Sequence, residues 1–112
     1  MDQPLTPAVP ANARVGLLVR LEAKPEHAQE LEELLTGALP LAEEESGTTV
    51  WFALRLGPTT FGIFDAFANE EARRAHVEGK IAAVLRSEGP RLLAAKPEIG
   101  PHDVLAAKLP TA

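Results

Sequence analysis

Residues 48–76 constrain the fold most, because they carry the pattern of a tight β-hairpin that runs directly into a capped helix. Two apolar runs rich in β-favouring residues flank Gly57 and Pro58, and this arrangement predicts strand, turn and strand. Asn69 follows at an N-cap position, with two glutamates behind it at the positive end of the predicted helix. The same segment holds the only Trp of the chain, together with an Asp and a His. The candidate chemistry therefore lies where the fold is most clearly defined.

The segment before the hairpin predicts a strand and a broken helix. Residues 15–23 place apolar side chains on one face and mixed ones on the other, which is typical of a strand. Residues 25–46 carry apolar side chains at helical spacing. Pro40 lies inside that pattern, so we expect the helix to kink or split near Thr36–Gly37.

The segment after the hairpin predicts more helix and a final strand. A helix is expected over residues 70–78, ended by Gly79 in the left-handed conformation. Two short helical runs follow, separated by Gly89-Pro90, and the last strand is expected over residues 104–109.

The resulting order, β-α-β-β-α-β, is that of the ferredoxin-like fold, an α+β arrangement in which a four-stranded antiparallel sheet carries helices on one face. We expect a single domain over residues 14–112. Residues 1–13 contain three prolines among small and polar residues and are interpreted as a flexible N-terminal tail or arm.

The register of the hairpin decides which side chains face the helices. A turn that pairs Gly57 with Thr60 places Phe52 opposite Asp65, and the helix-facing side then includes Phe52, Ile63, Asp65 and Phe67. A three-residue turn would slip the pairing and place Asp65 beside Trp51 instead. We expect the first register.

Both faces of the hairpin are substantially apolar, whereas the helices can cover only one of them. In the expected register the uncovered face carries Leu18, Trp51, Ala53 and Phe64. The sequence therefore predicts a homodimer that packs sheet against sheet.

Composition excludes several classes of function. The formal net charge is −5 with Lys and Arg scattered, which argues against nucleic-acid or acidic-membrane binding. The chain has no Cys, only three dispersed His and no Gly-rich dinucleotide loop, so we expect no metal, flavin or haem. It shows neither a membrane-spanning run nor an export signal, and a cytoplasmic location is expected.

Asp65 and His76 are the candidate reactive pair. Asp65 lies among Ile63 and Phe67 on an apolar face, where a carboxylate is costly unless it is paired or functional. His76 falls on the sheet-facing side of the next helix, so Asp65 could orient its imidazole as a general base. The alternative is a structural pair at the helix margin. Trp51 is either a pocket wall or a dimer-interface anchor, and the acidic run at residues 43–45 is interpreted as a solvated face.

The segments FALRLGPTTFGIFDAF, ARRAHVEGKIAAVL and DVLAAKLP resemble the antibiotic biosynthesis monooxygenase family, and quinol-monooxygenase-like members in particular. The resemblance covers residues 15–110. It implies a dimeric α/β barrel of two ferredoxin-like protomers, each with a cavity between sheet and helices. Some members oxygenate quinols or polycyclic phenols with dioxygen and no cofactor, by deprotonating the substrate. The His of the family's second-helix pattern falls on His76.

Haem-degrading members are marked by an Asn on the first strand and a Trp near the end of the third, where this chain has Leu18 and Phe67. Haem degradation is therefore not expected. The sequence predicts a cofactor-independent monooxygenase of a quinol or polycyclic phenol. His76 and Asp65 would be catalytic, and the pocket walls would come from Phe52, Ile63, Phe67 and Trp51. A non-catalytic ligand-binding or stress-associated dimer, or an isomerase or decarboxylase-like use of the same base, remains the alternative.

Overall fold

A four-stranded antiparallel sheet organises the chain in a computed structural model that describes residues 8–110. Its strand order is β2-β3-β1-β4, and every neighbouring pair is antiparallel. The strands are β1 (Val15–Glu22), β2 (Thr48–Arg55), β3 (Thr60–Phe67) and β4 (Glu98–Asp103). This is the predicted ferredoxin-like α+β fold. The first seven residues of the predicted N-terminal tail lie outside the described part of the chain.

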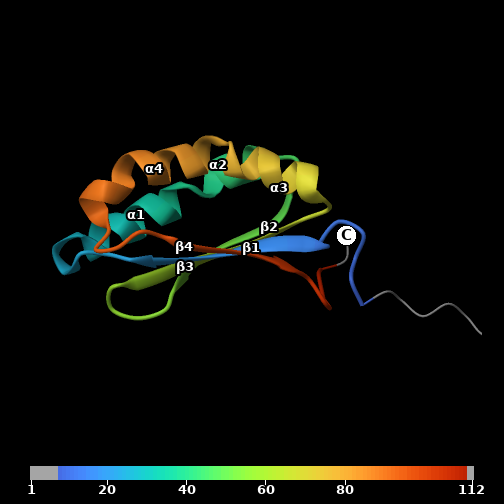
Figure 1. The fold of residues 1–112 in the computed structure, drawn as a ribbon, viewed down its shortest axis with the longest axis horizontal. Coiled ribbons are helices and arrows are strands. Elements are labelled where there is room, and N and C mark those ends of the chain that lie inside the picture. The colour runs from blue at the N-terminus through green and yellow to red at the C-terminus, as the bar shows by residue number, and fades with distance from the viewer. Residues whose placement is uncertain (1–7, 111–112) are drawn as a thin grey trace, which may run out of the picture.

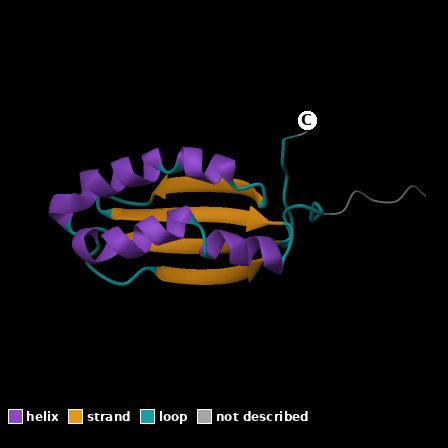
Figure 2. Cartoon of the chain, turned by 90° about the horizontal axis from the view of Figure 1, so that it is seen from above, coloured by secondary structure: helices purple, strands orange, loops and turns teal. Residues whose placement is uncertain are grey.

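All helices lie on one face of the sheet, and the opposite face carries none of them (Figure 1). Seen from above, they form two rows that run along the strands (Figure 2). The helical elements are η1 (Pro25–His27), α1 (Ala28–Gly37), α2 (Leu39–Glu44), α3 (Glu70–Val77) and α4 (Lys80–Leu92). The break between α1 and α2 confirms the expected split, with Pro40 in the first turn of α2. None of these helices, within residues 8–110, is long and apolar enough to cross a membrane.

The helical region after α3 differs from expectation in two ways. The structure has one helix, α4, that continues through Gly89-Pro90 in place of two short runs. A proline ring clashes with the Cβ of the preceding residue in a helix, and Gly89 has no Cβ, so this clash is absent. Gly79 was expected to be a left-handed cap, but its φ is −87° and it serves as the N-cap residue of α4.

The last strand lies earlier than predicted, at β4 (Glu98–Asp103), and residues 104–109 are not a strand. β4 pairs with β1 at the edge of the sheet, and an edge strand tolerates the Gly100-Pro101 pair because one of its sides needs no ladder hydrogen bonds. Beyond it, the Val104 amide donates to the Arg14 carbonyl at 2.9 Å, so this segment runs beside the N-terminal residues.

The predicted hairpin register is wrong by one position on β2. Trp51 lies opposite Asp65, and Phe52 lies opposite Phe64. The turn is longer than expected: the amides of Leu56 and Gly57 both donate to the Thr60 carbonyl, at 2.8 and 3.1 Å, so the ladder closes at Arg55 and Phe61. The Arg55 guanidinium lies 4.8 Å from the centre of the Phe61 ring, a cation–π contact that favours this pairing.

This slip exchanges the two faces of β2 and leaves β3 as predicted. Trp51 faces the helices and packs against buried core residues, whereas Phe52 faces away from them and is 52% exposed. The uncovered face remains apolar, but its members change. Leu18 and Phe64 stay on it, and Phe52, Leu54 and Leu56 replace Trp51 and Ala53.

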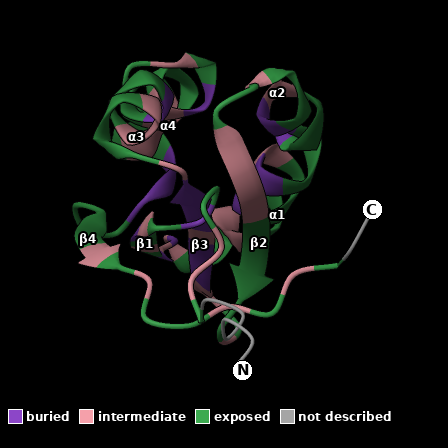
Figure 3. Ribbon diagram, turned by 90° about the vertical axis from the view of Figure 1, so that its right-hand side faces the viewer, coloured by how far each residue is buried: buried purple, intermediate pink, exposed green. Residues whose placement is uncertain are grey.

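The buried residues belong to the sheet and to the helices that cover it (Figure 3). In that view α3 and α4 lie over the β4–β1 side, and α1 and α2 lie over β2. Its largest cluster joins side chains of the sheet, α1 and the end of α4, and its buried members are Leu21, Ala23, Leu31, Leu35, Phe61, Ile63, Leu92 and Leu93. Both rows of helices are thus held to the same face of the sheet by a shared apolar interior.

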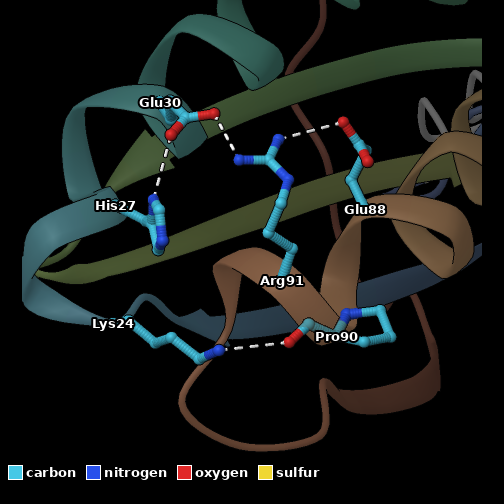
Figure 4. Close-up of polar contacts among 6 residues, drawn as sticks. All are labelled: Lys24, His27, Glu30, Glu88, Pro90 and Arg91. Carbon is cyan, nitrogen blue, oxygen red and sulfur yellow. Dashed lines mark hydrogen bonds and ion pairs between the residues drawn. The ribbon is translucent and has the colours of Figure 1, made fainter.

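A polar network joins the end of α4 to the start of α1 (Figure 4). Arg91 contacts Glu30 at 2.7 Å and Glu88 at 3.1 Å, and His27 contacts Glu30 at 2.9 Å. Arg91 and then His27 lower the pKa of the Glu30 carboxyl by hydrogen bonding to it. The Lys24 ammonium donates to the Pro90 carbonyl at 3.2 Å. These groups lie at the surface, so the network contributes little to stability.

Gly16 and Gly37 offer a matched test of this packing. A Cβ on Gly16 would lie 2.7 Å from the Asp65 carbonyl oxygen and 2.6 Å from His102 Nε2, whereas a Cβ on Gly37 would meet nothing within 4 Å. We expect Gly16→Ala to lower the free energy of unfolding by roughly 1–3 kcal/mol through overpacking. Gly37→Ala should raise it by about 0.4–1 kcal/mol. Urea denaturation followed by Trp51 fluorescence measures both. Equal effects of the two substitutions would contradict the close approach at Gly16.

Candidate functional site

A cavity of about 500 Å³ lies between the α3–α4 layer and the sheet. Leu17, Val19 and Ile63 form part of its floor on the sheet side, and Ile81 and Leu85 line it from α4. Its ionisable lining side chains are Asp65, His76, Arg86 and Lys96. This size and an apolar lining with a few polar groups are typical of small-molecule sites.

The predicted contact between Asp65 and His76 is present. Asp65 points from β3 toward the helices, and its Oδ2 lies 3.0 Å from His76 Nε2. His76 occupies the last turn of α3, a helix that starts where Asn69 Oδ1 accepts a hydrogen bond from the Ala72 amide at 2.9 Å. The N-cap and the length of α3 together bring the imidazole over β3. The Phe67 ring lies 5.2 Å from that of His76 and supports it.

Glu45 completes the site and was missed by the sequence analysis, which interpreted residues 43–45 as a solvated face. Its Oε1 lies 2.6 Å from His76 Nδ1 and also accepts a hydrogen bond from the Thr48 hydroxyl at 2.6 Å. Glu45 follows α2 directly, and its side chain is 20% exposed against 64% for Glu44. The one signal in the sequence is its position at the end of the helix, where the chain turns into the hairpin.

His76 therefore lies between two carboxylates, one at each ring nitrogen. Burial alone lowers the pKa of His76, but the contacts with Asp65 and Glu45 outweigh it, and the net pKa is raised above 6.5. Both nitrogens can donate only when the ring is the imidazolium. The arrangement thus favours the protonated ring, and neither nitrogen is left free to accept a proton.

Asp65 keeps the acceptor capacity that His76 lacks. Its side chain is 1% exposed, and neither carboxylate oxygen receives a hydrogen bond of standard geometry from residues 8–110. Oδ2 has the ion-pair contact with His76, whereas Oδ1 has no polar partner in that part of the chain. The Trp51 indole N–H, at the strand position opposite, is also buried and has no acceptor among the described residues. A buried acceptor beside a cavity is an expected place for a ligand to donate a hydrogen bond.

A metal centre does not fit this arrangement. No group of three or more His, Asp or Glu within residues 8–110 converges in a way that could hold an ion. Asp65 and Glu45 lie at opposite nitrogens of His76, so their oxygens do not point at a common centre.

The predicted site residues fall into three groups. Ile63, Asp65 and His76 line the cavity. Phe67 and Trp51 are on the helix side of the sheet but are not among its lining residues, and Trp51 is a core residue in place of an interface anchor. Phe52 is on the far face, because the hairpin register differs from the predicted one.

Comparison with known proteins now identifies the family. The sequence profile described as antibiotic biosynthesis monooxygenase matches residues 14–83. The chain belongs to the antibiotic biosynthesis monooxygenase family. Among curated proteins, none matches this chain.

Solved structures of similar proteins share the fold. A protein of unknown function from Nitrosomonas europaea, NE2512, is 51% identical, with a TM-score of 0.89, over 92% of this chain and 100% of its own. PA3566 from Pseudomonas aeruginosa is 19% identical, with a TM-score of 0.74, over 87% and 99%. A Caulobacter crescentus protein named as a candidate antibiotic biosynthesis monooxygenase is 21% identical, with a TM-score of 0.71, over 83% and 91%. The last two support the fold alone.

The His76 cluster predicts how stability depends on pH. Because the pKa of His76 is higher in the folded chain, its contribution to stability is complete below about pH 6.5 and is lost as pH rises through the raised value. We expect His76→Gln to lose stability relative to wild type at pH 6, and the difference to shrink toward pH 9. Urea denaturation across that range measures it, with the surface substitution His27→Gln as control. A difference that grows with pH would contradict the imidazolium assignment.

Proposed function

We propose that this protein is a cofactor-independent monooxygenase of a quinol or polycyclic phenolic substrate. The observation that carries the proposal is the buried Oδ1 of Asp65 at the edge of an apolar cavity, which has no polar partner within residues 8–110. It lies beside a His76 that contacts a carboxylate at each ring nitrogen. Membership of the monooxygenase family supports the same reaction class. The lining offers no set of metal ligands, so the chemistry proposed uses protein side chains, substrate and dioxygen.

The cavity supports deprotonation of the substrate as the first step. The substrate hydroxyl donates to Asp65 Oδ1 and loses its proton to this carboxylate, and the adjacent imidazolium stabilises the anion. The anion then supplies electrons to dioxygen. One oxygen atom forms a carbonyl on the ring, the other leaves as water with two hydrogens from the substrate, and a quinone results. Apolar walls from Leu17, Ile63 and Leu85 keep bulk water from the anion.

The structure changes the roles expected for the two residues. The sequence favoured His76 as base and Asp65 as the residue that orients it. With both ring nitrogens held by carboxylates, His76 can act as base only after one contact opens. We therefore assign proton acceptance to Asp65, charge stabilisation to His76, and positioning of His76 to Glu45.

We also propose that the working form is a homodimer that packs through the uncovered sheet face. This face carries Leu18 and Phe52, each 52% exposed, and the Phe52 and Phe64 rings stack with centroids 6.3 Å apart. An apolar patch of this kind on a sheet without helices favours a second copy, in a dimeric α/β barrel.

A non-catalytic ligand-binding dimer is the second candidate, and one observation favours it. A His76 held as imidazolium by two carboxylates is also what a purely structural cluster looks like. The two candidates differ in whether a bound aromatic hydroxy compound is consumed together with dioxygen.

Oxygen uptake with a panel of quinols and anthrones tests the proposed activity. We expect Asp65→Asn and His76→Ala to lower kcat by about 10²–10⁴-fold, the range for loss of acid–base catalysis. His27→Ala, outside the cavity, should retain wild-type kcat, and uptake should survive treatment with a metal chelator. Binding of these compounds without any oxygen uptake would favour the ligand-binding alternative. Wild-type turnover by folded Asp65→Asn protein would remove Asp65 from the reaction.

Light scattering coupled to size exclusion tests the dimer. We expect wild type to elute as a dimer that buries about 2,000 Å² or more, and Phe52→Glu to elute as a monomer because it puts a charge in the interface. Val84→Glu adds the same charge on α4, away from the sheet, and should remain dimeric. A wild-type monomer at micromolar concentration contradicts the proposed interface.

A further inference from the structure

We propose that the cavity takes hydroxyaryl carboxylates, with the ligand's anionic group held by Arg86 and Lys96 and its hydroxyl donating to Asp65. This rests on the proposed function, because it names the substrate class of the same cavity. It specifies an acidic aromatic ligand with its two polar groups at opposite ends.

At one end of the cavity, Asp65 requires a hydrogen-bond donor on the ligand. Its Oδ1 is buried and has no partner within the described residues, and leaving such an acceptor unpaired costs free energy. A ligand hydroxyl supplies the missing donor. The surrounding side chains of Leu17, Ile63 and Ile81 are apolar, so an aromatic ring fits behind that hydroxyl.

Arg86 and Lys96 supply positive charge to the cavity lining. Both line the cavity and are exposed, and within residues 8–110 neither has a carboxylate at ion-pair distance. In the structure the Arg86 guanidinium lies toward the end of α3, where it donates to the Val77 carbonyl at 3.4 Å. This single weak contact leaves most of its donors available, so the side chain can turn toward the anionic group of a ligand. Arg91, five residues further along α4 and outside the cavity, is instead paired with two glutamates. Two free cations at an apolar cavity attract an anion.

The strand register gives the separation between Asp65 and Lys96. Asp65 lies opposite Leu17 on β1, and Glu98 lies opposite Arg20. Three residues of strand cover about 10 Å, and Lys96 precedes Glu98 by two positions. A ligand that reaches both Asp65 and Lys96 must therefore be elongated, and a two-ring aromatic compound with polar groups at opposite ends has this shape. The cavity volume of about 500 Å³ has room for it.

Calorimetric titration with three related probes tests this proposal. The probes are 6-hydroxy-2-naphthoate, its neutral amide, and 2-naphthoate, which lacks the hydroxyl. We expect 6-hydroxy-2-naphthoate to bind at least 10-fold more tightly than either of the others. Equal Kd values for the acid and the amide, or no binding of any probe at millimolar concentration, would overturn the proposal.

A pair of double variants assigns the preference to the two cations. Arg86→Gln/Lys96→Gln should lose the preference for the acid over the amide while it still binds the amide. Arg74→Gln/Lys108→Gln removes the same two charges from exposed positions outside the cavity lining and should keep the preference. Loss in both variants would show a general charge effect and overturn the assigned subsite.

Oxygen uptake separates this inference from the proposed function. Preferential binding of 6-hydroxy-2-naphthoate without uptake on any hydroxyaryl carboxylate means that the subsite stands and the monooxygenase proposal fails. Uptake on neutral quinols with no preference for acids means that the activity stands and the subsite fails.

Discussion

The contact of one imidazole with two carboxylates holds three parts of this fold together. His76 belongs to α3, Asp65 to β3, and Glu45 to the connection between α2 and β2. Removing one partner from a buried charged pair typically costs about 3–5 kcal/mol, because the other charge is left unpaired. The position of α3 over the sheet therefore depends on this cluster, and with it one end of the cavity.

The same cluster explains why apolar packing alone is a poor account of how α3 is attached to the sheet. α3 has a mostly polar sequence, and His76 is its buried residue. A helix with so little apolar surface gains little from burial, so its attachment depends on specific polar contacts. Arg73 supplies another, donating to the Gly16 carbonyl at 2.9 Å. The architecture here is fixed by charge and hydrogen bonding as much as by the core.

The sequence was sufficient where local periodicity decides the outcome. Ile63, Asp65 and Phe67 alternate on β3, and their common face follows from the strand period. His76 follows from helical spacing after a recognisable cap. Those two patterns were enough to bring Asp65 and His76 together, and to place both under the helices.

It was insufficient where a choice depends on one residue of turn or on a distant contact. β2 is apolar on both faces, so its pattern accepts either register. The turn hydrogen bonds to Thr60 and the Arg55–Phe61 contact select the one in which Trp51 faces the helices. Glu45 lies 31 positions before His76, and no spacing rule links them. Arg86 and Lys96 reach one cavity because α4 stays unbroken through Gly89-Pro90, which a helix-breaking pair does not predict.

The cavity and the proposed dimer surface lie on opposite faces of the same sheet. Leu17 and Leu18 are neighbours on β1, yet Leu17 is part of the cavity floor and Leu18 is on the uncovered face. A shift of β1 that accommodates a ligand would move both side chains at once. If a ligand binds the dimer more tightly than the monomer, linkage requires the bound ligand to strengthen dimerisation by the same free energy. Occupancy of the cavity and self-association would then regulate each other.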